Sequence, residues 1–309
     1  MHELADIADQ LTALIGPADG EPVPLEGGIT NRNLLVTAGG ERYVVRRPGK
    51  DTELLGIDRT AEIEANRAAA RVGIAPGVIG MAGECLVTRF VPCRALHEGE
   101  LARRAGELGE QLRRFHDCGV QLTATFDVGS LLDHYERLAL ERGASIDADY
   151  GRAREAMGRI DAALGPRESV PCHNDLLAGN LIVTDEDRLM IVDWEYAGRG
   201  DGMFDLGNAV VNNELDDDAA QRLLTGYDGT APDERRRAQL ALMKVASDAR
   251  EGAWGVLQGC ISALDFDFAG YAAQHFRRLR AAVQDPSFDR ALQSARRVWE
   301  DPENGLQAT

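Results

Sequence analysis

Lysine is nearly absent from this 309-residue sequence, which contains only Lys50 and Lys244 and carries almost all its positive charge on arginine. Chemistry that commonly uses a lysine must therefore use one of these two residues or an arginine. The sequence also lacks any run of about 18 apolar residues, the length that a membrane-spanning helix requires. Its first residues, "MHELADIADQL", show neither the basic nor the apolar segment of a signal peptide. We therefore expect a cytoplasmic protein with no membrane partner.

Cysteine is scarce and dispersed, with five residues and no C-x-x-C pair. This pattern provides neither the ligand spacing of a zinc site nor a disulfide framework, so we expect free thiols. The five residues are Cys85, Cys93, Cys118, Cys172 and Cys260.

Basic residues are also few, because 34 of them stand against 51 acidic residues and leave a formal net charge of −17. A surface of that sign repels phosphate backbones and anionic lipids. We therefore expect no nucleic-acid partner, whereas a cationic small molecule would be tolerated.

The first ninety residues have the pattern of a small sheet with one helix. Two short β-type runs at 31–49 are joined by Ala-Gly-Gly, which predicts a hairpin, and a second strand pair is expected at 77–91. Between these pairs, the segment 57–73 is rich in good helix formers and ends at a glycine. We expect these elements to form an N-terminal lobe at 1–91.

After Pro92 the pattern is mostly helical, and short strands interrupt it only at 170–193, where they flank a polar loop. The sequence thus predicts an α+β fold of two lobes, the second being a larger, mainly helical lobe at 92–309. Its expected helices are 100–119, 131–143, 149–164, 203–213, 216–226, 232–262, 267–283 and 287–299.

The segment "HNDLLAGN" at 173–180 combines polar groups that suit metal and phosphate chemistry. Asp175 is a carboxylate that could reach a substrate hydroxyl, and Asn180 offers a neutral oxygen ligand. Asp193 ends the apolar strand "RLMIV", and such a position suits magnesium, which binds a few protein oxygens together with phosphate oxygens. An aspartate, an asparagine five residues later and an aspartate after a hairpin is the order found in kinase-like catalytic sites. A plain polar turn before a strand is the alternative for the short motif alone.

Two histidines near these motifs are expected to be structural. We expect His173 to hold the backbone of the polar loop by a hydrogen bond. His116, in "LRRFHDCG", is expected to pack at a helix end and not to ligate a metal.

The first lobe of a kinase-like fold supplies phosphate contacts. "EGGITNRN" at 26–33 precedes a strand and could place N–H groups near phosphate, although it lacks G-x-G-x-x-G and also fits an ordinary hairpin turn. The strand "RYVVRRPG" at 42–49 contains no lysine, so Arg46 is the expected phosphate-binding base. Glu62 and Glu64 on the following helix are its candidate partners, with a solvated helix face as the alternative for each.

Taken together, these segments resemble the choline/ethanolamine kinase family, within the wider group of aminoglycoside-phosphotransferase-like enzymes. The resemblance covers roughly residues 25–280. "DWEYAG" and the stretch at 254–271 favour the choline/ethanolamine branch, whereas the Asp-Asn-Asp pattern is shared by all these kinases. The segments that carry the resemblance are "GGITNRNLLV", "YVVRRPG", "IDRTAEIEANRAAARVGIAP", "VTRFVP", "CHNDLLAGNLIV", "IVDWEYAG", "FDLGN" and "WGVLQGCISALDFDFAGY".

This resemblance implies a protein-kinase-like fold and an ATP-dependent kinase that uses Mg²⁺. It implies that Asp175 accepts the proton of the substrate hydroxyl. It also implies that Asn180 and Asp193 hold Mg²⁺, with Glu195 close to the metal.

The nucleotide contacts implied by the resemblance come from the first lobe. Arg46 would take the place of the usual lysine beside the phosphates, with Glu62 as its expected helix partner. Asn31, which follows the glycine-containing turn, would also lie at the nucleotide. In "TRFV", Arg89 and Val91 would offer main-chain groups to adenine.

A quaternary ammonium donates no hydrogen bonds, so a site for it needs aromatic faces and nearby carboxylates. The resemblance places Trp254, Phe268 and Tyr271 in paired C-terminal helices that wall the amine pocket, and Tyr196 follows the magnesium loop. Packing between helices is the alternative for these aromatic residues. Glu251 stands where animal choline kinases have a second tryptophan, and a primary ammonium with three donors would suit it better than a trimethylated one.

The sequence therefore predicts a kinase that phosphorylates the hydroxyl of a small amino alcohol, choline or ethanolamine, with ATP as co-substrate. An aminoglycoside or other amino-sugar kinase is the alternative with the same chemistry. A non-catalytic nucleotide or amine sensor is a third class, but it would be expected to lack one of the three catalytic residues. Members of the family are often dimers, so a homodimer is one expected assembly, although no sequence feature decides it.

Overall fold

The computed structural model describes residues 2–25, 31–49 and 52–296. The glycine-containing segment 26–33 was expected near the phosphates, and its residues 26–30 lie outside the described residues. Among the helices that can be described, none combines the length and the apolar character needed to cross a membrane.

The chain divides into two compact units, which are described separately. The lobe boundary expected at residue 91 falls inside unit 1, because the two units divide the chain at other positions. The division into lobes at residue 91 stays a prediction. Unit 1 comprises Met1–Asp127 and Ser169–Ala231, and unit 2 comprises Val128–Glu168 and Pro232–Thr309.

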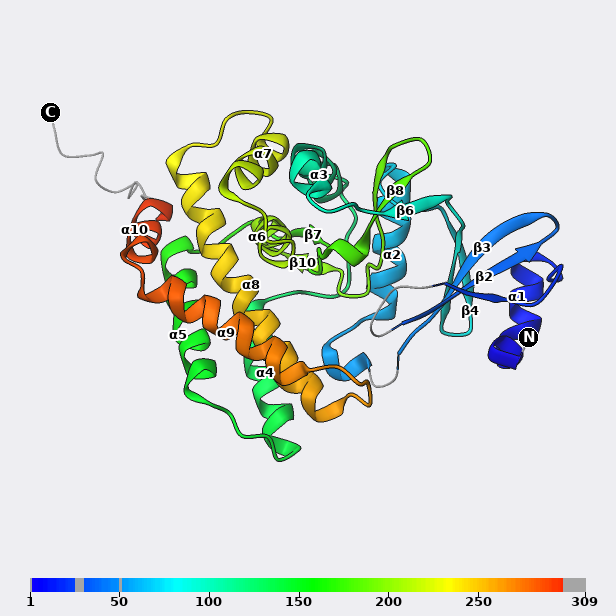
Figure 1. Ribbon diagram of the computed structural model, residues 1–309, viewed down its shortest axis with the longest axis horizontal. Helices are drawn as coiled ribbons and strands as arrows, with labels where there is room; N and C mark the ends of the chain where they lie inside the picture. Colours follow the sequence, from blue (N-terminus) through cyan, green and yellow to red (C-terminus); the bar gives the residue numbers. More distant parts are fainter. Residues whose placement is uncertain (1, 26–30, 50–51, 297–309) are drawn as a thin grey trace, which may run out of the picture. The chain divides into compact units, whose positions relative to one another are not determined.

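Unit 1 contains a five-stranded antiparallel sheet in the order β1-β2-β3-β5-β4 (Figure 1). The hairpin predicted at 31–49 is present and turns at Gly39 and Gly40, whose φ angles of 57° and 78° suit glycine. The strand pair predicted at 77–91 is also present. The strands are β1 (Val23–Leu25), β2 (Arg32–Ala38), β3 (Glu41–Arg47), β4 (Val78–Ala82) and β5 (Cys85–Arg89).

The two faces of this sheet differ because successive side chains of a strand alternate between faces. One face is apolar: Val36 and Val45 pack in a core with Ile7 and Leu11 of the N-terminal helical segment, η1 (His2–Ile7) and α1 (Ala8–Ile15). Arg46 follows Val45 in β3 and therefore points to the other face, towards the functional residues.

Helix α2 (Arg59–Arg71) confirms the single helix predicted among these strands. Asp58 caps its first turn, because the carboxylate accepts the N–H groups of Thr60 and Ala61. Small residues dominate its buried face, including Ala61 and Ala65, each 0% exposed. Their size allows the helix to lie close to its neighbours, and Glu62 is buried on it.

The rest of unit 1 carries the polar loops. The strands of two small antiparallel sheets, β6-β8-β9 and β10-β7, flank these loops. Three helices pack against one another nearby, and two of them, α3 and α6, contact β7 (Figure 1). The strands are β6 (Cys93–Ala95), β7 (Val170–Cys172), β8 (Leu181–Thr184), β9 (Leu189–Ile191) and β10 (Gly198–Gly200), and the helices are α3 (Glu100–His116), α6 (Gly202–Asn212) and α7 (Asp217–Asp228).

Unit 2 is helical, as the sequence pattern predicts. The long helix α8 packs against each of the other four helices, and its central turns are fully buried. The helices are α4 (Val128–Glu141), α5 (Ala148–Leu164), α8 (Glu234–Ile261), α9 (Phe268–Gln284) and α10 (Pro286–Ala295).

Candidate active site

The polar loop predicted from "HNDLLAGN" follows β7 and ends in a short 3-10 helix, Ala178–Asn180. Asn180 Nδ2 donates to the main-chain oxygen of Asp175 at 2.8 Å and to its Oδ2 at 3.1 Å. Asn180 is buried, whereas Asp175 is half-buried. The amide therefore fixes a carboxylate that a substrate hydroxyl could still reach, and Asn180 Oδ1 is the atom of this residue that could ligate a metal.

His173 has the structural role expected of it. Its Nε2 lies 3.0 Å from Val192 O, and Asp175 N donates to its Nδ1 at 3.2 Å. Because a carbonyl only accepts and an amide N–H only donates, Nε2 carries the hydrogen and Nδ1 accepts. Burial lowers the pKa of His173, which agrees with a neutral ring.

Asn174 links this loop to the next one. Its Nδ2 donates to Tyr196 O at 3.0 Å, and its side chain is fully buried. Its φ of 67° lies in the left-handed region, which asparagine tolerates better than most residues. The loop that carries Asp175 is thus tied to the loop that carries Asp193 at two points, through Asn174 and through His173.

Two substitutions separate the hydrogen bond of Asn174 from its backbone conformation. Asn174→Gly keeps the left-handed conformation and leaves Tyr196 O without this donor, which should lower the free energy of unfolding by about 1–2 kcal/mol. Asn174→Ala should lower it by roughly 1 kcal/mol more, because a Cβ is unfavourable at positive φ. Denaturant unfolding of both variants measures the difference. Equal losses in the two variants would contradict the conformational argument.

The second polar loop follows β9 and carries Asp193, whose φ is 63°. Arg46 Nη1 forms an ion pair with Asp193 Oδ1, and Arg46 Nη2 forms one with Glu62 Oε1. The structure therefore brings Arg46 and Glu62 together as predicted and does not pair Arg46 with the alternative, Glu64. One buried guanidinium joins the sheet, helix α2 and the second loop.

Arg59 is a second cation at this site that the sequence reasoning missed. Its Nη1 lies 2.5 Å from Glu62 Oε2 and 3.8 Å from Glu195 Oε2, and its Nη2 donates to Thr52 Oγ1 at 2.8 Å. The available signal was its position three residues before Glu62, since residues at this spacing are neighbours on a helix surface.

Asn31 also reaches both acidic residues of the second loop. Its Nδ2 lies 3.3 Å from Asp193 Oδ2 and 3.0 Å from Glu195 Oε2, and its Oδ1 accepts the N–H of Gly49 at 3.3 Å. Asn31 was expected at the nucleotide, and the structure places it beside the carboxylates.

Negative charge predominates in this network. Glu62, Asp193 and Glu195 bring three carboxylates to two guanidinium groups, those of Arg46 and Arg59. Burial and, to a lesser degree, the charge of Asp193 raise the pKa of Glu195. An additional cation would therefore be electrostatically favourable here.

The donor atoms nearby suit a hard divalent cation. Val192 N donates to Asn180 O at 2.9 Å, so Asn180 and Asp193 lie on adjoining segments. The side chains of Asn180, Asp193 and Glu195 offer only oxygen as ligand atoms, and Mg²⁺ prefers oxygen. These residues thus fit the metal that the sequence predicts.

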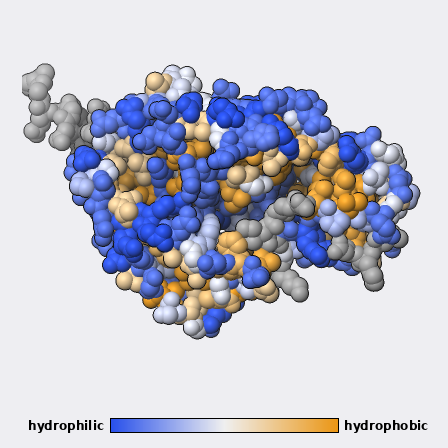
Figure 2. Space-filling view, viewed as in Figure 1, coloured by the Kyte–Doolittle hydropathy of each residue, from blue (hydrophilic) through white to orange (hydrophobic). Residues whose placement is uncertain are grey.

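A cavity of about 210 Å³ lies between the sheet and the polar loops of unit 1, and its lining is mostly apolar. Figure 2 shows hydrophobic side chains gathered over this sheet. Arg89 and Val91, which the family resemblance places near adenine, both belong to the cavity wall. Since Arg89 N already donates to Gly77 O at 2.8 Å, a main-chain donor from this pair would have to be Val91. The wall also includes Val44, Arg46, Leu86, Asn180, Ile182 and Asp193.

The aromatic residues expected at the amine form one cluster in unit 2. The centroid of Trp254 lies 5.8 Å from that of Phe268 and 5.6 Å from that of Tyr271, both with edge-to-face geometry. The ring centroid of Phe266, in the connection between α8 and α9, lies 4.9 Å from that of Phe268. Phe266 is 40% exposed, so the cluster reaches the surface. Tyr196, the fourth expected aromatic residue, is buried in unit 1.

Glu251 was expected to suit a primary ammonium, and in the structure its carboxylate already has partners within the protein. It is 2% exposed, its Oε1 accepts from Arg250 Nη1 at 2.9 Å and its Oε2 accepts the hydroxyl of Tyr271 at 2.8 Å. The carboxylate is therefore charge-balanced within α8 and orients Tyr271. A buried carboxylate needs such partners, and here the adjacent residue provides one.

Helix α6 provides loop anchors that sequence reasoning did not assign. Asp205 accepts the main-chain N–H groups of His173 and Asn174 at 2.8 and 2.7 Å. Asn208 Oδ1 accepts the N–H of Leu176 at 2.6 Å. Both anchors belong to "FDLGN", a segment that carries the family resemblance.

Comparison with known proteins agrees with this geometry. Residues 21–240 match the model of the phosphotransferase enzyme family. A crystal structure of a choline/ethanolamine kinase family protein from Mesorhizobium loti has 26% sequence identity and a TM-score of 0.78, covering 94% of this chain and 99% of that one. This likeness confirms the protein-kinase-like fold.

Two sequence relatives extend the comparison. The protein LicA of Haemophilus influenzae is 29% identical over 213 residues, which are 65% of this chain and 61% of LicA. This chain thus matches less than two thirds of that relative's length. A probable ethanolamine kinase of Arabidopsis thaliana is 25% identical over 291 residues, which cover 80% of this chain and 75% of the relative. The family model alone spans more than half of the sequence, and the chain belongs to the phosphotransferase enzyme family.

Proposed function

We propose that this chain is an ATP-dependent kinase that phosphorylates the hydroxyl of a small amino alcohol, choline or ethanolamine. The observation that carries the proposal is the pairing of two fixed polar groups, Asp175 with Asn180, next to the ion-pair network of Arg46. The family membership and the relatives named as choline/ethanolamine or ethanolamine kinases support the same chemistry.

In the proposed reaction, the hydroxyl of the acceptor attacks the terminal phosphorus of ATP, its proton passes to Asp175, and ADP leaves. Asp175 orients the hydroxyl through a carboxylate that Asn180 holds in place. Mg²⁺, held by Asn180 and Asp193 with Glu195 nearby, would neutralise phosphate charge when bound. Most of the rate enhancement would come from this positioning and charge stabilisation.

Arg46 is proposed to bind the nucleotide phosphates. It lines the mostly apolar cavity, and Glu62 holds its guanidinium from the side of α2. Adenine would occupy the apolar part of the cavity, with the carbonyl of Arg89 and the N–H of Val91 as its main-chain partners. Asn31 would hold the acidic loop beside the phosphates.

The amine end of the acceptor is proposed to contact the aromatic cluster of unit 2, which consists of Trp254, Phe268 and Tyr271. The expected contribution of Tyr196, a residue of unit 1, stays a prediction. Aromatic faces attract ammonium groups whether or not these carry hydrogen. Glu251 is proposed to act by holding the hydroxyl of Tyr271, since Arg250 balances its charge. Glu251 therefore gives the site no electrostatic preference for ethanolamine over choline. Both amino alcohols are proposed substrates.

Release of ADP from ATP in the presence of Mg²⁺ tests this proposal, with choline, ethanolamine and one aminoglycoside offered separately. We expect turnover with choline or ethanolamine above the rate without acceptor, and a phosphomonoester product visible by ³¹P NMR. Turnover with the aminoglycoside alone would contradict the proposed acceptor but not the kinase chemistry. ATP binding without turnover of any acceptor would contradict the proposed activity.

A further inference from the structure

Tyr271, one of the aromatic residues proposed at the amine, contacts polar side chains as well as other rings. Its hydroxyl donates to Glu251 Oε2 at 2.8 Å. Its ring centroid lies 4.5 Å from that of His275, one turn further along α9. The contacts that hold Glu251 and His275 in place therefore bear on the position of an aromatic face at the proposed amine site.

His275 belongs to a buried polar cluster between α8 and α9. Its Nδ1 lies 2.9 Å from Asp248 Oδ1, and Arg278 Nε donates to the same oxygen at 2.9 Å. Asp248 and His275 are 5% and 4% exposed. Because Arg278 Nη2 also lies 3.0 Å from His275 Nδ1, this nitrogen can donate to the carboxylate or accept from the guanidinium. In either tautomer, α9 keeps a charge-assisted hydrogen bond to Asp248.

These contacts lie on one face of each helix. The members of the two faces are Asp248, Glu251 and Trp254 on α8, and Tyr271, His275 and Arg278 on α9. Successive members are three or four residues apart, which is the spacing of neighbours on a helix surface. Two carboxylates of α8 thus hold α9 at points one turn apart, Glu251 through Tyr271 and Asp248 through the two members that follow.

Two glycines of α8 allow the helices to approach closely beside this row of contacts. A Cβ at Gly252 would lie 2.6 Å from a ring carbon of Phe276, which is closer than two carbon atoms can approach. A Cβ at Gly255 would lie 3.0 Å from the Cβ of Ala272. In so closely packed an interface, a displacement at His275 is transmitted to the neighbouring turn of α9.

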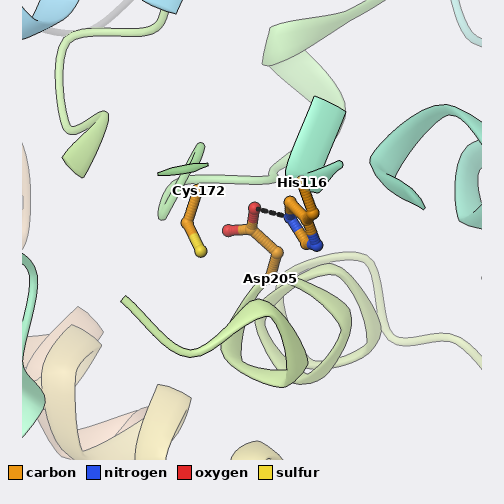
Figure 3. A group of neighbouring side chains, drawn as sticks. All are labelled: His116, Cys172 and Asp205. Carbon is orange, nitrogen blue, oxygen red and sulfur yellow. Dashed lines mark hydrogen bonds and ion pairs between the residues drawn. The ribbon is translucent and has the colours of Figure 1, made fainter. Parts of the chain in front are cut away.

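A histidine–aspartate contact of the same kind occurs in unit 1, in a different setting. His116 Nε2 lies 3.0 Å from Asp205 Oδ2, with Cys172 beside them, and all three residues are buried (Figure 3). Asp205 also accepts the N–H groups of His173 and Asn174, so that contact belongs to the polar loop already described. Burial raises the pKa of the Cys172 thiol well above its ordinary value, which keeps it protonated and unsuited to a metal. In unit 2, the neighbour of the histidine is instead an aromatic ring of the amine cluster.

We infer that Asp248 and His275 are positioning residues that act through Tyr271 on the amine end of the acceptor. This inference rests on the proposed function, because it assigns to them the placement of one of its aromatic faces. Buried ion pairs are often no more stabilising than apolar packing of similar volume, so a requirement for one position of Tyr271 accounts for them better than stability does.

The inference predicts which kinetic constant depends on these residues. Their effect should appear in KM for the acceptor and not in KM for ATP, because the residues proposed to bind the nucleotide belong to unit 1. A trimethylated ammonium donates no hydrogen bonds and depends on its contacts with aromatic faces. Choline should therefore be affected more than ethanolamine, whose ammonium can also donate hydrogen bonds.

Two substitutions in the full chain separate the two contacts of His275. His275→Phe keeps a ring beside Tyr271 and removes the hydrogen bond to Asp248, whereas His275→Gln keeps an N–H for Asp248 and removes the ring. Asp248→Asn keeps an acceptor oxygen and removes the charge. Tyr150→Phe is the matched control, because the buried hydroxyl of Tyr150 donates to Leu132 O at 2.7 Å and the variant loses one buried hydrogen bond elsewhere in unit 2.

Steady-state kinetics, the Kd of choline by calorimetry and the free energy of unfolding are measured for each variant. We expect both His275 variants to raise KM and Kd for choline about three- to tenfold, the scale of a weakened contact between an ammonium and an aromatic face. KM for ethanolamine should rise less, and KM for ATP should change less than about twofold. Asp248→Asn should show a smaller rise of the same kind, and it decides if neither His275 variant folds. Tyr150→Phe should lose stability with its KM values unchanged.

Unchanged acceptor KM and Kd in folded His275→Phe and His275→Gln would overturn the inference. Equal rises in KM for acceptor and for ATP would also overturn it, because they would indicate a general effect on the fold. The same holds for a loss of stability alone, as expected of Tyr150→Phe. Failure of the proposed function is recognised separately, because the unmodified chain would then neither bind nor turn over choline or ethanolamine.

Discussion

An Asp175→Asn variant should fold normally and lose about 10³-fold in kcat, the scale of a missing general base. The amide has the same shape as the carboxylate, and its oxygen can still accept the hydrogen bond that Asn180 Nδ2 donates to Asp175 Oδ2 at 3.1 Å. What it loses is the ability to take a proton from the acceptor hydroxyl. Steady-state kinetics with saturating ATP and the best acceptor measure the effect.

Because Asp175 is not placed at the nucleotide, the affinity for ATP should change little in this variant. Asp185→Asn is the matched control, since this carboxylate is exposed in the hairpin between β8 and β9. Retention of more than about a tenth of the original kcat by Asp175→Asn would contradict the role of base, given the usual size of such contributions.

The sequence permitted the contacts among the candidate site residues to be predicted because these residues lie in patterns with a definite spacing. Asp175 and Asn180 share one loop, and Asp193 follows the next strand, so local order alone brings them close. Arg46 lies in a strand that was recognised from two β-type runs joined by Ala-Gly-Gly, and Glu62 lies in a helix that was recognised from its helix-forming composition and terminal glycine. Their mutual ion pair is a direct consequence of that arrangement.

Asp205 and Asn208, two of the residues that sequence reasoning missed, act through contacts between distant segments. Asp205 lies about thirty residues from the peptide groups that it holds, and nothing in the spacing of "FDLGN" indicates its partners. The strands β7 and β10 have three residues each, too few to show an alternating pattern. Tertiary packing decides such features.

Glu251 shows why a charged residue cannot be assigned to a ligand from sequence alone. Its place, where animal choline kinases have a second tryptophan, indicated a carboxylate that would suit a primary ammonium. In the structure Arg250, its immediate neighbour, balances that charge, and both side chains are almost fully buried. Consecutive residues of a helix point in different directions, so their spacing offered no reason to pair them.

Arg46→Met should have the second large effect, and it should act on stability and nucleotide binding together. Removing the guanidinium leaves Asp193 without this ion pair and leaves Glu62 with Arg59 as its remaining ion-pair partner. Breaking a buried pair by removing one member costs about 3 kcal/mol of unfolding free energy. KM for ATP should rise strongly, and kcat/KM should fall about 10²–10³-fold, as expected for the loss of more than one charge-assisted contact to phosphate.

Arg46→Lys distinguishes charge from geometry at the same position. The guanidinium contacts Glu62 through one nitrogen and Asp193 through the other, and a single ammonium group cannot reproduce this fork. We expect Arg46→Lys to be more stable than Arg46→Met and still to lose about 10–100-fold in kcat/KM for ATP, the equivalent of one charge-assisted hydrogen bond.

The neighbouring residue is the control for both Arg46 variants. Arg47 lies on the opposite face of β3 and pairs with Asp6, whose side chain is 62% exposed. An exposed pair of this kind contributes at most about 1 kcal/mol, so Arg47→Met should change neither stability nor ATP kinetics greatly. Equal kinetic effects of Arg46→Met and Arg47→Met would show that a positive charge on either face of β3 affects ATP kinetics in the same way. That result would contradict a specific contact between Arg46 and the phosphates. A loss confined to Arg46 ties phosphate binding to the face of the sheet that carries the cavity.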